Sequence, residues 1–134
     1  MRNKESLYTK DSVFFKDKYY QLMNHTKLDV VTVAAVNLNY GGSHHKNFTS
    51  TPEYIKLMKN KMRLMFSLAI KNDCENLILG AWGCGVFKND PYDVAEMFKK
   101  VTQEYNIKNV VFAIINDHNS VDDNYSVFKR IINR

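Results

Sequence analysis

The residues best suited to chemistry in this sequence lie in one glycine-rich stretch, which reads GAWGCGVFKNDP from Gly80 to Pro91. Glycine has no Cβ, so the backbone at Gly83 and Gly85 can adopt positive φ and bring its N–H groups close to an anion. The chain has five glycines, and three of them are at positions 80, 83 and 85. This spacing predicts a loop that binds a phosphate-bearing ligand.

Three apolar side chains lie among these glycines, namely those of Trp82, Val86 and Phe87. Exposed apolar side chains beside flexible glycines are suited to form a wall against a ring or a sugar. For Trp82 we favour a packing role over that of a stacking platform. A second interpretation of the whole stretch stays open, because glycines between a strand and a helix often serve only the turn.

The elements that must position this loop begin with three apolar runs, at 29–36, 76–82 and 109–115. The runs are continuous and do not alternate with polar residues, which is typical of parallel strands covered by helices on both faces. Each run is therefore predicted to be a strand. Residues 1–29 are harder to interpret: Val13, Phe14 and Phe15 form either a short strand or an anchored loop.

Helix patterns with recognisable N-termini follow these strands. The first begins after Thr51 and the second after Asp90, and in both a capping side chain precedes a proline. The third is indicated by Ser120 with Asp123 three residues later, a capping-box pattern in which the shorter Asp takes the place of Glu. The side chains expected to face the core are Ile55, Met58, Met62, Met65, Phe66 and Ala69 in the first helix, Val94, Phe98, Val101 and Tyr105 in the second, and Val121, Tyr125, Phe128 and Ile132 in the third.

Strands and helices alternate in this order, which predicts right-handed βαβ crossovers and an α/β fold with a mainly parallel sheet. Ligands of such sheets bind beyond the carboxyl ends of the strands, and the loop that starts at Gly80 follows the second strand. Asp90, as N-cap, is expected to use part of the anion-binding capacity of the next helix. Three strands leave sheet edges that residues 1–29, a second copy of the chain or another protein must cover.

The glycine loop and its flanking elements resemble the second signature of the microbial-type poly(ADP-ribose) glycohydrolase family, a branch of the macrodomain superfamily. Three other segments are similar to that family: the run from Tyr8 to Asp17, the strand that ends in Val33-Ala34-Ala35-Val36-Asn37, and the final strand Val110 to Ile114. The resemblance covers nearly the whole chain. It implies that residues 1–134 form one domain, a truncated macrodomain-like αβα sandwich with three layers.

The resemblance also implies a ligand, which is ADP-ribose or an ADP-ribosylated protein. The residues that match the family's loop around the diphosphate and the distal ribose are Gly83, Cys84, Gly85, Val86 and Phe87. Phe87 would pack on that ribose, and Asn37, near the end of its strand, is a weaker match. No cofactor and no metal are implied.

One segment of the family pattern is absent from this sequence. Family enzymes have a triple-glycine loop followed by a glutamine and two adjacent glutamates, one of which is the acid that cleaves the ribosyl bond. This chain has neither Gly-Gly-Gly nor Glu-Glu, and it begins where that segment is expected to end. Cleavage of a ribosyl bond needs a placed carboxyl group. Asp90 and Asp93 are expected to serve a helix N-terminus, and Asp117 is expected in a turn.

We therefore expect a binding protein that lacks catalysis on its own. Two alternatives stay open. The chain is either half or a fragment of an active glycohydrolase, completed by an N-terminal half that carries the glutamates, or a degenerate remnant kept for interaction. For the same reason the partner that covers the sheet edge is either that complementary half or a second copy of the chain.

Composition sets the remaining limits. A chain of 134 residues fits one domain, and no apolar run approaches the roughly 20 residues of a membrane-spanning helix. The default location is cytoplasmic, since no signal peptide is recognisable. The net charge of +5 fits an anionic ligand, but the lysines are scattered over helix faces and argue against a nucleic-acid interface.

Histidine and cysteine do not form a recognisable site. His44 and His45 are adjacent in a polar loop without a third ligand, so they are interpreted as solvated. A disulfide between Cys74 and Cys84 is not expected without a secretory signal. For Cys84 a small residue that fits a crowded loop is favoured over a reactive thiol.

Overall fold

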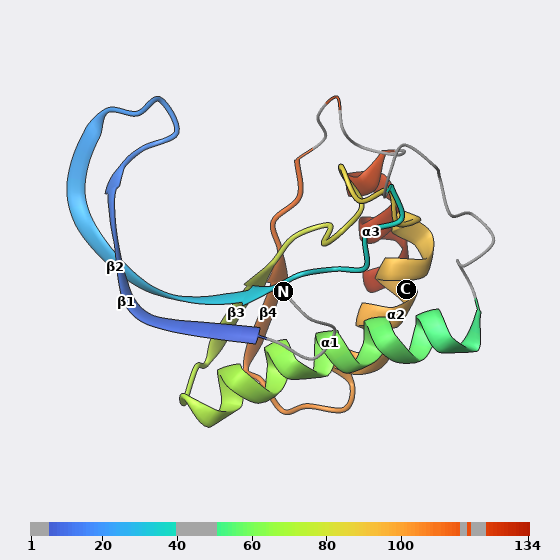
Figure 1. The fold of residues 1–134 in the computed structure, drawn as a ribbon. Helices are drawn as coiled ribbons and strands as arrows, with labels where there is room; N and C mark the ends of the chain where they lie inside the picture. The colour runs from blue at the N-terminus through green and yellow to red at the C-terminus, as the bar shows by residue number, and fades with distance from the viewer. Residues whose placement is uncertain (1–5, 40–50, 116–117, 119–122) are drawn as a thin grey trace.

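The computed structural model of the chain describes residues 6–39, 51–115, 118 and 123–134. Within these residues the order of elements is β1, β2, α1, β3, α2, β4 and α3 (Figure 1). Their bounds are Ser6–Lys16 for β1, Leu22–Val33 for β2, Pro52–Lys71 for α1, Asn76–Leu79 for β3, Pro91–Thr102 for α2, Asn109–Phe112 for β4 and Asn124–Ile132 for α3. The fold is therefore α/β, as predicted.

The described strands form two separate pairs. β1 and β2 are an antiparallel hairpin, whereas β3 and β4 are parallel and joined through α2. The prediction of a mainly parallel sheet is not confirmed, because the first apolar run belongs to the antiparallel pair. That run was also predicted too far along the chain, since β2 ends at Val33.

The segment that the sequence left open, Val13 to Phe15, is part of strand β1. Asp17 organises the turn of the hairpin, since its carboxylate accepts hydrogen bonds from the backbone N–H groups of Tyr19 and Gln21 at 2.8 and 2.9 Å. The turn lets β2 fold back along β1, so residues 1–29 supply a strand that the apolar pattern alone did not reveal.

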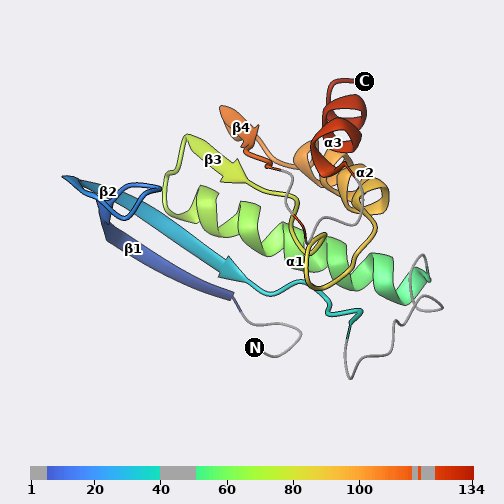
Figure 2. The ribbon, with the colours of Figure 1, turned by 90° about the horizontal axis from the view of Figure 1, so that it is seen from above.

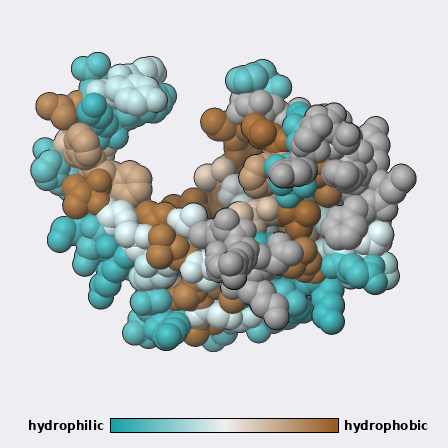
Figure 3. Space-filling model, in the orientation of Figure 1, coloured by the Kyte–Doolittle hydropathy of each residue, from teal (hydrophilic) through white to brown (hydrophobic). Residues whose placement is uncertain are grey.

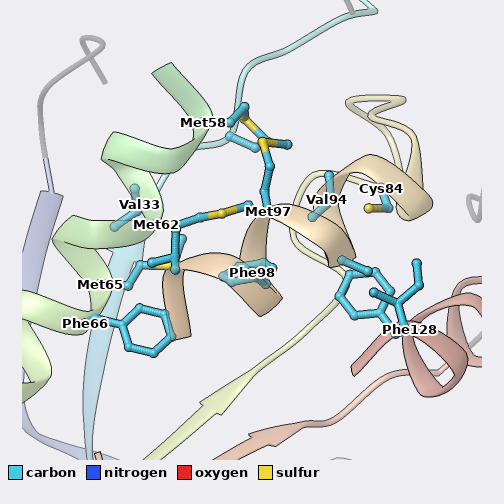
Figure 4. Close-up of a cluster of buried hydrophobic side chains, with 14 of the residues drawn as sticks. Val33, Met58, Met62, Met65, Phe66, Cys84, Val94, Met97, Phe98 and Phe128 are labelled. Carbon is cyan, nitrogen blue, oxygen red and sulfur yellow. The ribbon is translucent and has the colours of Figure 1, made fainter. Parts of the chain in front are cut away.

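Helices α1 and α2 begin where the sequence predicts. The Thr51 hydroxyl accepts a hydrogen bond from the Tyr54 N–H at 3.2 Å, and the Asp90 carboxylate accepts from the N–H groups of Tyr92 and Asp93. The methionine stripe of α1, Met58, Met62 and Met65, is buried as predicted (Figure 4). The other buried apolar side chains of α1 and α2 are Tyr54, Phe66, Ala69, Val94, Ala95, Met97, Phe98 and Val101.

Helix α3 begins later than predicted. Its N-cap is Asp123, whose carboxylate accepts from the Ser126 N–H at 3.1 Å, while Ser120 and Val121 lie outside the described residues. The buried face of α3 also differs from the predicted one: Phe128 is buried as expected, but Ile131 is buried and Tyr125 is exposed. Tyr105, predicted in the second helix, is half-buried beyond the end of α2 and stacks on Phe66.

The hairpin curves away from the body formed by the helices and the β3–β4 pair (Figures 1 and 2). Helix α1 lies against β2 on one side and α2 on the other. The space-filling view shows an open hollow between the hairpin and the body, with apolar residues at its base (Figure 3). None of the described helices is long and apolar enough to cross a membrane.

Candidate functional site

The glycine loop lies between β3 and α2 and is held in a compact set of turns. The N–H of Cys84 donates to the carbonyl of Ala81, and the N–H groups of Lys88 and Asn89 donate to the carbonyls of Gly85 and Gly83, each at 3.0 Å. The loop is therefore a defined structure at the carboxyl end of a parallel strand, the place where ligands of α/β sheets bind.

Gly83 is required for this backbone path. Its φ is +81°, and a Cβ built on it would lie 2.7 Å from Ala35 Cβ and 2.8 Å from Asn89 Nδ2. A side chain there would be both strained and overlapping. Gly85 is different, because Gly83 alone among the described glycines has positive φ. Positive φ, which the sequence allows at both glycines, is therefore found at Gly83 and not at Gly85.

The side chain of Asn89 holds the glycine loop in place through hydrogen bonds. Its buried side chain donates from Nδ2 to the carbonyls of Val36 and Gly83 at 2.8 and 2.9 Å, and its Oδ1 accepts from the Tyr54 hydroxyl at 2.7 Å. Burial is the largest cause that raises the pKa of Tyr54, so this hydroxyl remains a donor. Sequence reasoning missed both residues, although an asparagine directly before the Asp90 N-cap was an available signal.

The loop is also joined to the segment that follows β2. Trp82 Nε1 donates to the Val33 carbonyl at 2.8 Å, which fits the predicted packing role, and the ring lies edge-on to Phe98. Further along, the Leu38 N–H donates to the Phe87 carbonyl at 3.0 Å. The carboxyl ends of β2 and β3 are thus held together.

Asn37 lies in this second segment and is exposed. Its Oδ1 accepts a hydrogen bond from the Asn39 N–H at 2.9 Å, and Asn39 Nδ2 donates to the Val86 carbonyl at 3.3 Å. The structure therefore brings Asn37 beside the glycine loop, linked to it through one residue.

Between Gly83 and Phe87, four backbone N–H groups have no hydrogen-bond partner within the described part of the chain: those of Gly83, Gly85, Val86 and Phe87. Successive unpaired N–H groups in a tight loop form a concave site for an anion. The N-terminus of α2 adds less, since Asp90 already accepts two of its N–H groups. The loop amides, and not the helix end, are therefore the groups available to a phosphate.

The side chains of the loop divide between surface and core. Val86 is 59% exposed and Phe87 is half-buried against the core, so both can contribute to a wall at the surface. Cys84 is fully buried beside Val94 (Figure 4), and burial raises the pKa of its thiol to about 12. Its amide and its thiol are both engaged inside the protein, and the two cysteines are not bonded to each other.

Three further residues were considered as site residues in the sequence analysis and lie outside the described residues: His44, His45 and Asp117. Within the described residues no cluster of three or more His, Cys, Asp or Glu side chains could hold a metal ion. Two cavities, of about 330 and 680 Å³, lie beside the strands and do not include the glycine loop.

A substitution at Asn89 tests how the loop is held. Asn89→Ala should lower the free energy of unfolding by roughly 2–4 kcal/mol, because it removes the three side-chain hydrogen bonds of a buried residue, with the Tyr54 hydroxyl and with the carbonyls of Val36 and Gly83. The matched control is Asn39→Ala, which removes one exposed hydrogen bond and should cost below about 1 kcal/mol. Urea unfolding followed by Trp82 fluorescence measures both. Equal effects would show that Asn89 does not hold the loop.

The fold and the loop together define an α/β protein in which a loop with unpaired backbone N–H groups lies at the carboxyl end of a parallel strand. Solved structures of the same kind are bacterial poly(ADP-ribose) glycohydrolases. The enzyme of Deinococcus radiodurans in complex with ADP-ribose matches 96% of this chain with a TM-score of 0.82 and 26% identity, and its apo form matches with a TM-score of 0.80. The enzyme of Thermomonospora curvata matches 93% of the chain with a TM-score of 0.78 and 25% identity.

The likeness confirms the resemblance of the sequence to this enzyme family and the macrodomain-like α/β fold. The chain spans about half the length of these structures, 52% of the Deinococcus radiodurans chain and 46% of the Thermomonospora curvata chain. No family model matches the sequence, and no curated protein matches it either.

Proposed function

We propose that this chain binds ADP-ribose through the loop from Gly83 to Phe87. The observation that carries the proposal is the row of unpaired backbone N–H groups at Gly83, Gly85, Val86 and Phe87. These groups are neutral donors, so they can bind the two phosphates of a diphosphate without the cost of a buried cation. The likeness to a glycohydrolase structure that holds ADP-ribose supports this choice of ligand.

The remaining loop residues have separate roles in the proposal. Phe87 presents part of its ring beside the donors and packs on the distal ribose. Asn37 adds a polar group at the edge of the site, and Cys84 supports the loop from the core. The natural ligand is free ADP-ribose or ADP-ribose attached to a protein, because the diphosphate is common to both.

We propose further that the described chain binds without cleaving. A ribosyl bond breaks when a carboxyl group protonates the leaving oxygen, and the Asp90 carboxylate is already occupied by two backbone N–H groups. The second candidate is half of a glycohydrolase, which the coverage of about half of each matched enzyme favours. The two candidates share the binding loop and differ in whether a partner supplies the acid.

Calorimetric titration with ADP-ribose tests binding. We expect a dissociation constant between about 1 µM and 1 mM, which corresponds to roughly 4–8 kcal/mol. Adenosine, which lacks the diphosphate, should not bind measurably. The absence of both binding heat and a thermal shift at millimolar ADP-ribose would contradict the proposal.

Gly85→Val tests the loop itself. Gly85 does not have positive φ, so the variant should fold, while the added side chain blocks the approach of a phosphate to the loop amides. Affinity for ADP-ribose should fall at least about tenfold, a loss of about 1.4 kcal/mol. The matched control is Gly80→Ala, whose new Cβ would make an ordinary contact of 3.7 Å with the Ala113 carbonyl oxygen. A folded Gly85→Val protein with unchanged affinity would mean that the loop is only a turn.

A further inference from the structure

A groove of about 680 Å³ runs between the two strand pairs, with β2 on one side and β3 on the other. Five consecutive residues at 27–31 and six consecutive residues at 74–79 line it. Only alternate residues of a strand face a groove that lies over the face of a sheet. Consecutive residues on both sides therefore mean that the groove lies between two strand edges.

Both edges are unpaired within the described residues, where β2 bonds only to β1 and β3 only to β4. The carbonyls of Glu75 and Leu79 accept hydrogen bonds from β4, from the N–H groups of Asn109 and Ala113. Backbone groups of a strand alternate in direction, so those of Asn76 and Ile78 face the groove.

The base and one end of the groove are also defined. Met65 and Ala69 of α1 form an apolar base. At one end the Tyr8 hydroxyl lies 3.5 Å from Cys74 Sγ and also donates to the Asp29 carboxylate, which connects the hairpin to the start of β3. A strand placed in the groove would bond to an edge on each side and rest alternate side chains on α1. Five or six residues is the usual length of a strand.

We propose that the groove binds one extended strand of a polypeptide that carries the part of the glycohydrolase fold missing from this chain. The match to the Deinococcus radiodurans enzyme covers 96% of this chain and 52% of that chain, so about half of that enzyme has no counterpart here. The inserted strand would join β2 and β3 into one continuous sheet. This interaction does not depend on ligand binding by the glycine loop.

The β3–β4 pair indicates that the partner is more than a single strand. Ile78 and Val111 are register partners with 68% and 53% exposure, on the face of the pair opposite to the buried Leu77. The outer edge of β4 borders a second groove, of about 330 Å³, lined by the consecutive residues 110–112 and by α3. Among the described residues nothing covers this apolar face or pairs with this second edge, which favours a partner with a layer of its own.

The test uses the part of the Deinococcus radiodurans glycohydrolase that the match leaves out, expressed together with this chain. We expect the two polypeptides to purify as a one-to-one complex. Hydrogen exchange without ADP-ribose should then show the amides of Asn76 and Ile78 exchanging at least about tenfold more slowly than in the chain alone.

Two variants at Ile78 separate backbone pairing from side-chain contact. Ile78→Pro removes an N–H that faces the groove and none that faces β4, so the chain should fold and complex formation should fall at least about tenfold. Ile78→Thr keeps the N–H and the preference for extended backbone, and should retain the complex. Circular dichroism of the free variants checks that they fold. If Ile78→Pro does not fold, the hydrogen exchange of Asn76 and Ile78 in the unmodified chain, with and without the partner, tests the pairing instead.

Three results would overturn the proposal. They are no complex between the two polypeptides, a complex in which Asn76 and Ile78 remain unprotected, and a dimer of this chain in which the same amides are protected. The last would assign the groove to a second copy. ADP-ribose binding is measured separately, so either proposal can fail while the other stands.

Discussion

Gly83→Val is expected to unfold the chain or to leave it barely stable. Valine at φ +81° is strained, and its Cβ would overlap Ala35 Cβ and the Asn89 side chain. Backbone strain and overpacking each cost about 1–3 kcal/mol, so a loss of roughly 2–6 kcal/mol is expected. That is a large share of the 5–15 kcal/mol typical of a domain. Urea unfolding read by Trp82 fluorescence measures the loss, because Trp82 belongs to the same loop.

Gly80→Ala is the control for this result as well, since position 80 has room for a Cβ and no positive φ. Its unfolding midpoint should stay close to that of the unmodified chain. A Gly83→Val midpoint equal to that of the control would show that the loop does not adopt the conformation described for Gly83.

The second large effect concerns catalysis. The chain alone should release no ADP-ribose from poly(ADP-ribose), because the Asp90 carboxylate near the loop is held by the N–H groups of Tyr92 and Asp93. Together with the unmatched part of the Deinococcus radiodurans enzyme, release should rise at least about 100-fold, the lower range of what a positioned general acid contributes. Chromatography of released ADP-ribose measures both rates.

Turnover by the purified chain alone would contradict this prediction. If that turnover were lost in Asp117→Asn and kept in Asp90→Asn, the carboxyl group of Asp117 would be the acid. The chain would then be an enzyme without a partner, while ADP-ribose binding by the loop would still stand.

Local signals in the sequence predicted the helices well. The starts of α1 and α2 were predictable because Thr51 and Asp90 cap neighbouring N–H groups, an interaction that spans three residues or fewer. The start of α3 was missed because Ser120 and Asp123 are both good capping residues, and only packing of Phe128 and Ile131 selects between them.

Strand pairing was predicted less well. The run at 29–36 showed a buried strand but not its partner, because consecutive apolar residues look alike in parallel and antiparallel pairs. The partner, β1, is an exposed strand with charged residues and a weak apolar pattern. Pairing of Ser6 with Val33 joins residues far apart in the sequence, so no window of neighbouring residues contains it.

The candidate site was partly predictable. The glycine spacing indicated a loop between a strand and a helix, and Gly83 has the positive φ that this spacing allows. That the loop binds a phosphate stays a prediction. The hydrogen bonds of Asn89 to Tyr54 and Val36 were not predictable, since they connect three elements that meet only in the folded chain.

Because Cys84 is buried, the labelling rate of its thiol reports opening of the glycine loop. With a pKa of about 12, roughly one thiol in ten thousand is ionised at pH 8, and that one is covered by protein. An alkylating reagent therefore reacts with Cys84 only when the loop opens and exposes the thiol. The half-buried Cys74 serves as an internal reference. The ratio of the two labelling rates reports how often the loop opens, and a ligand seated on the loop would slow the rate at Cys84 without changing the rate at Cys74.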